Sequence, residues 1–213
     1  VKLLCLCSAG NPTSKALLME DIGAIAGSSR YTGIVVVDEA YVDFSTKGSA
    51  VALVNKYPNV VVLQTLSKAF GLAAIRCGFC IGAPDVIQLM NNVKAPYNVN
   101  TLTSEVAINA MNSITTLEEN IAKLLAQLNV VAAKLAQLDF VRKVYPSDSN
   151  FLLFRVKDKA LELYKTMAAD AGVLTRYRGN EMHCDQCIRV TIGTEDENNQ
   201  MLELLQNTWK DLN

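Results

Sequence analysis

The sequence lacks the patterns that mark several whole classes of protein. Its apolar runs are all too short to cross a membrane as a helix. Basic residues form no stripe and the aromatic residues are scattered, so we expect no nucleic-acid partner. A Gly-x-x-x-x-Gly-Lys-Ser/Thr loop is missing, which argues against a nucleotide-hydrolysing enzyme. Repeats and low-complexity tracts are absent too. The absences leave a globular protein for which neither membranes nor nucleic acids are expected partners.

Histidine is almost missing as well, and this limits the metal sites that the chain can form. The one histidine, His183, precedes Cys184, and Cys187 completes a Cys-x-x-Cys pair. Three candidate ligands, two of them neighbours in sequence, suit a tetrahedral zinc site poorly. A thioredoxin-like redox pair would lack its usual βαβ setting. We therefore expect neither a bound metal nor a redox-active cysteine pair in this segment.

Cysteine is present, although not in the pattern of a small secreted chain held by disulfides. Most of the cysteines lie within apolar segments, so we expect reduced thiols in the core of a cytoplasmic protein. The six residues are Cys5, Cys7, Cys77, Cys80, Cys184 and Cys187.

The composition is that of a folded chain: 213 residues, 50% hydrophobic, with a net charge of −1. This suffices for one core, or for a larger and a smaller lobe. Short apolar runs alternate with helical patterns up to residue 93, which is typical of an α/β fold with a parallel sheet covered by helices on both faces. The expected strands cover residues 3–7, 34–37, 60–63 and 77–81, and the expected helices cover residues 14–27, 49–56 and 85–92.

The remainder predicts a long helix and a second lobe. Residues 101–138 carry an apolar stripe at helical spacing, with a break expected near Asn112 and Ser113. Expected strands then cover residues 140–145, 151–156, 173–176 and 187–192, and expected helices cover residues 159–171 and 195–212.

Polar side chains gather at the ends of the expected strands in the first part. Asp38 and Tyr41 follow the second strand, and Lys68 follows the third. Arg76 precedes the fourth, so that strand is expected to run opposite to the others. A lysine amine can bond to an aldehyde cofactor and then move a proton, and a carboxylate keeps a ring nitrogen protonated. This set suggests an enzyme that uses pyridoxal phosphate (PLP).

The chain contains an ordered set of motifs: Asn11-Pro12-Thr13, Asp38-Glu39-Ala40-Tyr41, Ser67-Lys68, Arg76 and Cys187-Ile188-Arg189-Val190-Thr191. This set closely resembles the motifs of fold-type I PLP-dependent aminotransferases and, within them, the fungal form of the histidinol-phosphate aminotransferases. The resemblance implies a large mixed-sheet domain and a smaller α+β domain. Residues 1–100 would form part of the large PLP-binding domain, residues 101–138 a connecting helix, and residues 139–213 the small domain.

The resemblance also implies a role for each matching residue. Lys68 would bind PLP covalently and shuttle the proton, Asp38 would pair with the ring nitrogen, and the ring hydroxyl would meet Tyr41 and Asn11. Thr65, Ser67 and Arg76 would hold the PLP phosphate, and Arg176 and Arg189 would bind the substrate anion. The implied reaction is amino transfer between histidinol phosphate and 2-oxoglutarate, which yields glutamate, in histidine biosynthesis. The intact protein would be a cytoplasmic homodimer.

Several alternatives stay open. Another fold-type I PLP enzyme, an aromatic aminotransferase or a phospho-amino-acid decarboxylase, would share most of these motifs. Family members also carry a long portion before the position of Val1, so we expect sequence upstream, and an inactive fragment is a further alternative. Ser14 stands where the family has glycine, which predicts an adjusted turn. We expect Glu39 to be a helix-end or strand-end charge and not a second acid, and Arg178 to be solvated or peripheral.

Overall fold

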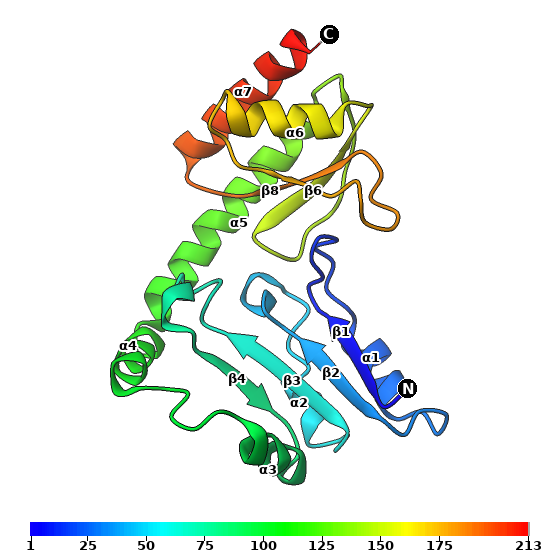
Figure 1. Cartoon of the computed structure of the whole chain (residues 1–213), viewed down its shortest axis with the longest axis vertical. Coiled ribbons are helices and arrows are strands. Elements are labelled where there is room, and N and C mark those ends of the chain that lie inside the picture. The colour runs from blue at the N-terminus through cyan, green and yellow to red at the C-terminus, as the bar shows by residue number, and fades with distance from the viewer. Residues whose placement is uncertain (213) are drawn as a thin grey trace. The chain divides into compact units, whose positions relative to one another are not determined.

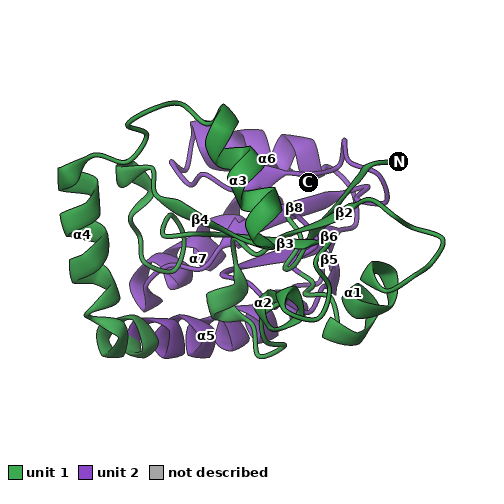
Figure 2. Cartoon of the chain, turned by 90° about the horizontal axis from the view of Figure 1, so that it is seen from below, with its two compact units in different colours: residues 1–11, 15–119 green, residues 12–14, 120–213 purple. Residues whose placement is uncertain are grey.

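The computed structural model describes residues 1–212, which form two compact units (Figure 2). The first unit holds residues 1–11 and 15–119, and the second holds residues 12–14 and the chain from residue 120 onward. The division falls inside one helix, α5 (Ile114–Ala136). Within the described part of the chain, no helix combines the length and the apolar character that a membrane span requires.

A four-stranded mixed sheet is the centre of the first unit (Figure 1). Its strands lie in the order β1 (Leu3–Cys7), β2 (Ile34–Asp38), β3 (Val60–Thr65) and β4 (Gly78–Ile81). The first three are parallel, and β4 is antiparallel to β3. The four expected strands are confirmed, and so is the reversed direction of the strand that follows Arg76.

The first two helices of the first unit are shorter than the sequence suggested, whereas the third is slightly longer. They are α1 (Met19–Ala26), α2 (Val51–Val54), α3 (Pro84–Val93) and α4 (Thr101–Met111), with 3₁₀ turns at Val42–Phe44 and Ala73–Ile75. The expected start of the first helix at residue 14 is wrong, because Ser14 takes a left-handed conformation and Leu18 is extended. The predicted break in the long helix is confirmed, since α4 ends at Met111 and α5 begins at Ile114.

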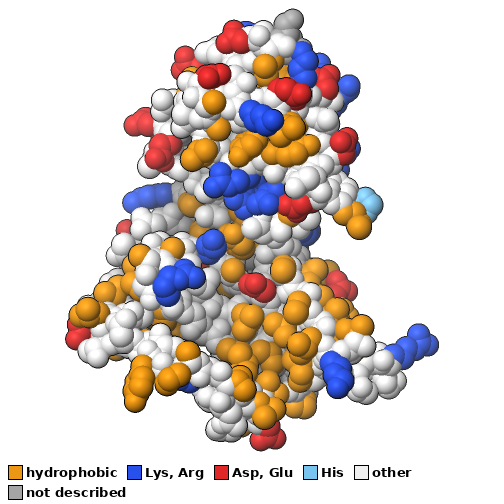
Figure 3. Space-filling view, viewed as in Figure 1, with side chains coloured by type: hydrophobic (Ala, Val, Ile, Leu, Met, Phe, Trp, Pro, Cys, Tyr) orange, Lys and Arg blue, Asp and Glu red, His pale blue; other side chains and the backbone are white. Residues whose placement is uncertain are grey.

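The two faces of this sheet differ in how they are covered. One face packs against α1 and α2 through a core that includes Val35, Val37 and Val62. On the opposite face Leu3, Cys5 and Cys7 of β1 are exposed, and Figure 3 shows apolar side chains gathered there. The expected burial of Cys5 and Cys7 is therefore wrong, because within the described residues this face of β1 is left uncovered.

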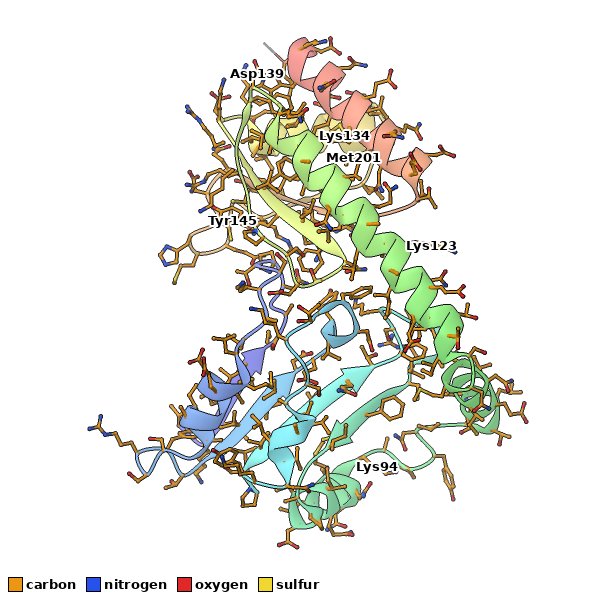
Figure 4. The ribbon with its side chains drawn as sticks, turned by 180° about the vertical axis from the view of Figure 1, so that it is seen from behind. Lys94, Lys123, Lys134, Asp139, Tyr145 and Met201 are labelled. Atoms are coloured by element: carbon orange, nitrogen blue, oxygen red, sulfur yellow. The ribbon has the colours of Figure 1, made fainter. Side chains whose placement is uncertain are left out.

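The second unit packs three helices against one face of an antiparallel sheet. The strands lie in the order β5 (Val141–Val144), β6 (Phe151–Val156), β8 (Cys187–Thr191) and β7 (Arg176–Tyr177). The helices are α5, α6 (Ala160–Ala169) and α7 (Glu195–Asp211). Figure 4 shows Lys134 of α5 and Met201 of α7 where these two helices lie side by side.

The core of the second unit follows the expected apolar stripe. Leu128, Val131 and Leu135 of α5 are buried with alternate residues of β6 and β8. The ring of Trp209 in α7 stacks on Phe140, the residue just before β5, with centroids 4.6 Å apart. β7 is shorter than expected, because residues 173–175 take no strand structure. The sequence pattern alone did not show that only Arg176 and Tyr177 pair with β8.

Candidate active site

The residues assigned to the cofactor lie at one edge of the first sheet. Asp38 ends the parallel strand β2, Asn11 and Lys68 follow the carboxyl ends of β1 and β3, and Arg76 lies two residues before the antiparallel β4. The carboxyl ends of parallel strands meet at the same edge of a sheet, where α/β proteins place their ligands. The topology therefore brings four separated sequence segments together within the first unit.

Asp38 is the last residue of β2 and shares the exposed face of the sheet with Cys7. The two residues are paired in the parallel register of β1 and β2, and paired residues project from the same face. One Asp38 oxygen accepts the Ala40 amide at 3.0 Å, which fixes the carboxylate at the strand end. Burial and the charge of Asp38 raise the pKa of the Cys7 thiol. The sequence did not single out Cys7, although its place at the end of a neighbouring strand was a usable signal.

Lys68 and Tyr41 come together beyond the ends of β2 and β3. The Lys68 Nζ atom lies 5.4 Å from the centroid of the Tyr41 ring. Tyr41 is buried while Lys68 is exposed, so the Lys68 amine is accessible to a small molecule and lies beside a buried phenol ring. The chain turns back directly after Lys68, where Gly71 donates to the Lys68 carbonyl and takes a φ of +69°. That left-handed conformation suits glycine best.

Hydroxyl groups line the turn between β3 and Lys68. The Thr65 hydroxyl donates to Ser67 Oγ at 2.9 Å and accepts the Ser67 amide at 3.1 Å. Arg76 ends the adjacent 3₁₀ turn with a φ of +54°, and its guanidinium donates to the Ala73 carbonyl at 2.9 Å. Arg76 is exposed, so its side chain is accessible to an anion. Two hydroxyls and a guanidinium are a suitable donor set for a phosphate.

Glu39 is the most important residue that the sequence interpretation undervalued. It is only 1% exposed and accepts three hydrogen bonds, from Ser49 Oγ at 2.6 Å, the Ala50 amide at 2.6 Å and Gln64 Nε2 at 2.9 Å. It is thus a buried carboxylate that links the end of β2 to the start of α2 and to β3. Burial, and then the charge of Glu39, raise the pKa of Asp43.

The turn after β1 holds Ser14, which stands where the family has glycine. Ser14 takes a φ of +57°, the left-handed region that glycine adopts freely. Its hydroxyl lies 2.7 Å from the Thr13 carbonyl and 3.2 Å from the Pro146 carbonyl, and its own carbonyl accepts the Asp148 amide. The predicted adjustment is thus a serine held in a glycine-like conformation by its neighbours in the second unit.

Arg176 and Arg189 lie opposite each other in the second unit. They are directly paired in the antiparallel register of β7 and β8, so both side chains project from one face of the sheet. The guanidinium of Arg189 lies over the Phe151 ring at 4.9 Å, and that of Arg176 donates to the Thr175 carbonyl. Two cations placed directly opposite each other repel, so the arrangement favours a bound anion.

The segment between β7 and β8 corrects one expectation. Arg178, expected to be solvated or peripheral, is not a purely solvated charge: its Nη1 atom lies 2.7 Å from Glu181 Oε1, and both side chains are partly buried. Cys184 and Cys187 are buried free thiols, and burial raises the pKa of each. Within residues 1–212, no cluster of three metal-ligating side chains occurs.

Comparison with known proteins finds relatives along nearly the whole chain. A family model described as "Aminotransferase class I and II" matches residues 1–205. A histidinol-phosphate aminotransferase from Candida maltosa is 42% identical over 226 residues, which cover 100% of this chain and 58% of the relative. The chain thus spans little more than half the length of that curated relative. The resemblance drawn from the motifs is confirmed.

Two solved structures show the fold. The histidinol-phosphate aminotransferase from Clostridium acetobutylicum superimposes with a TM-score of 0.92 at 20% identity, covering 99% of this chain and 65% of the other. The L-threonine-O-3-phosphate decarboxylase from Porphyromonas gingivalis gives a TM-score of 0.87 at 25% identity, with 99% and 65% covered. Both resemble this chain across its two units, so the fold alone does not separate amino transfer from decarboxylation.

Proposed function

The chain belongs to the aminotransferase class I and II family, and on that premise we propose that it carries the Lys68 site of a PLP-dependent histidinol-phosphate aminotransferase. The proposed reaction transfers an amino group between histidinol phosphate and 2-oxoglutarate in histidine biosynthesis. One observation carries the proposal: Lys68 Nζ lies 5.4 Å from the Tyr41 ring, at the strand edge where β2 ends in Asp38.

The residues present at this edge fit PLP. The Asp38 carboxylate suits a protonated ring nitrogen, and the phenol of Tyr41 and the amide of Asn11 suit the ring hydroxyl. The hydroxyls of Thr65 and Ser67, with the guanidinium of Arg76, suit the phosphate; in this site Lys68 is the residue that accepts and returns the proton. When bound, PLP supplies an electron sink for the substrate carbon.

The arginine pair supports a phosphate ester as the substrate. Histidinol phosphate has no carboxylate, so its phosphate is the anion that the enzyme can hold. Arg176 and Arg189, opposite each other on one face, can place two planar guanidinium groups on one phosphate dianion. We propose that they bind the substrate phosphate.

A spectroscopic experiment tests the cofactor assignment. PLP is added to the purified chain, the absorbance of bound PLP is recorded, and borohydride is used to fix the cofactor to its lysine. We expect the label on the peptide that contains Lys68, and we expect no label in Lys68→Ala. A label that stays in Lys68→Ala, or a wild-type chain without any bound-PLP band, contradicts a functional site in this chain.

A second candidate function rests on the phosphothreonine decarboxylase likeness. The compound for which that decarboxylase is named, L-threonine-O-3-phosphate, is also a phosphate ester, so the arginine pair fits both reactions. Assays with histidinol phosphate, phenylalanine and phosphothreonine separate the candidates. Glutamate formed only with histidinol phosphate supports our proposal, whereas carbon dioxide released from phosphothreonine supports the decarboxylase, and turnover of phenylalanine supports an aromatic aminotransferase.

We further propose the organisation of the intact protein. Residues 1–100 would belong to a large PLP-binding domain, residues 101–138 would connect it, and residues 139–213 would form a small domain. The division of the chain inside α5 supports this arrangement. The six free cysteines support a reducing compartment such as the cytoplasm. We expect a homodimer, which sedimentation of the full-length protein can test.

A further inference from the structure

A third arginine lies next to the pair formed by Arg176 and Arg189. The antiparallel ladder continues one step beyond β7, because the Arg178 amide donates to the Cys187 carbonyl at 2.9 Å. Side chains alternate along a strand, so Arg178 projects from the same face as Arg176. Two residues along a strand span about 6.6 Å, which long arginine side chains bridge easily.

The guanidinium of Arg178 has one charged partner, and it also has a buried donor atom that no described residue satisfies. Its Nη1 atom pairs with Glu181 Oε1 at 2.7 Å, three residues further on. Its Nε atom is buried and has no hydrogen-bond partner among the described residues. Buried donors are nearly always satisfied in native proteins, and an exception needs an explanation. A ligand anion that accepts from this donor would supply one.

We propose that Arg178 is a specificity-determining residue that adds a third guanidinium to the phosphate site, and that Glu181 holds it in place until a dianion binds. The inference rests on the proposed role of Arg176 and Arg189. A phosphate ester offers three terminal oxygens, which three planar guanidinium groups can share. A carboxylate offers two oxygens and one charge, so the third arginine discriminates in favour of phosphate.

The Glu181 carboxylate competes with the incoming anion for Arg178. This competition gives the inference a specific signature, because removing the Glu181 charge should tighten phosphate binding only while Arg178 is present. A general change in surface potential would act with or without Arg178. A double-mutant cycle separates the two explanations.

The experiment measures inorganic phosphate binding to the full chain by calorimetry at pH about 8, where the dianion predominates. Ionic strength is held constant, and acetate is titrated in parallel. The variants are Arg178→Gln, Glu181→Gln and the double variant. Arg142→Gln, which removes an exposed arginine from β5 of the same unit, is the matched control. Thermal melting confirms that each variant is folded.

We expect Arg178→Gln to weaken phosphate binding about tenfold, since one hydrogen bond between charged groups contributes on that order, and to weaken acetate binding less. Glu181→Gln should tighten phosphate binding, and this gain should vanish in the double variant. Arg142→Gln should change little. An Arg178→Gln variant that binds phosphate like the wild type overturns the inference, as does a Glu181→Gln gain that persists without Arg178.

Arg176→Gln separates a failure of this inference from a failure of the proposed function. If Arg176→Gln weakens phosphate binding while Arg178→Gln does not, the arginine pair stands and only the third arginine is wrong. If Arg176→Gln has no effect, or the wild-type chain binds no phosphate, the phosphate site itself is wrong and this inference fails with it.

Discussion

Replacing Glu39 with leucine should destabilise the first unit strongly. The substitution removes the acceptor of three hydrogen bonds, from Ser49, Ala50 and Gln64. Ala50 is fully buried, so its amide loses its partner without gaining water. Hydrogen bonds to a charged group contribute about 1.5–3 kcal/mol each. The Ser49 and Gln64 side chains are half-buried and recover part of their loss, so we expect a net cost of about 3–5 kcal/mol.

Two milder variants separate the contribution of the Glu39 charge to stability from that of its hydrogen-bond geometry. Glu39→Gln keeps the size and one acceptor for the Ala50 amide, but its amide nitrogen faces the amide of Gln64. We expect a cost of roughly 1–2 kcal/mol. Adding Gln64→Glu restores a carboxylate–amide pair in the reverse order and should recover most of that loss.

Urea unfolding measures the overall stability, and hydrogen exchange of the β2 and β3 amides reports the first unit alone, because the two units can unfold separately. Glu105→Gln, an exposed change in α4, serves as a control. If Glu39→Leu unfolds at the wild-type urea midpoint, or if the double variant is no more stable than Glu39→Gln, the stabilising role of the hydrogen bonds to Glu39 is incorrect.

Three further predictions concern single residues. Ser14→Ala should cost about 1–2 kcal/mol because it keeps the left-handed strain and loses the hydroxyl, whereas Ser14→Gly should stay near the wild-type value; thermal melts compare them. Thr194→Ala should cost about 1 kcal/mol by removing the cap of α7. Hydrogen bonds from Thr194 lower the pKa of Glu197. Their contribution to stability is therefore fully present above the ordinary glutamate pKa and is lost as the pH falls through the lowered value. A stability difference between Thr194→Ala and wild type that does not shrink in acid contradicts this. Asp43→Asn should stabilise the chain at neutral pH, because burial and the charge of Glu39 raise the pKa of the Asp43 carboxyl. This gain in stability should disappear below the ordinary aspartate range, where the carboxyl is protonated in both the folded and the unfolded chain. Denaturant unfolding curves at two pH values test the prediction.

The sequence predicted the strands of the first unit well, because each is a short apolar run with polar residues just beyond it. The reversed β4 also followed from the order of Arg76 and its strand. The start of α1 was predicted too early, because the left-handed conformation of Ser14 depends on contacts with Pro146 and Asp148, more than 130 residues away. Helical periodicity cannot detect such a distant constraint.

The candidate site was predicted unevenly for a similar reason. Motif residues such as Lys68 and Asp38 lie at strand ends, where chain order is enough to bring them together. Glu39 and Arg178 looked like ordinary surface charges because their partners, Gln64 and Glu181, belong to no motif. Only a hydrogen-bond network in three dimensions distinguishes a buried carboxylate from a solvated one.

Asp38, the last residue of β2, and Glu39, the residue after it, point to opposite faces of the sheet and differ in function. Asp38 projects from the open face with Cys7, while the next residue, Glu39, is buried beside α2 with Val37. Losing or gaining one residue within β2 would move each carboxylate to the opposite face, which would expose Glu39 and bury Asp38, the proposed partner of the ring nitrogen. Natural variation in this strand should therefore proceed by replacement, and insertions or deletions should be confined to the loops on either side.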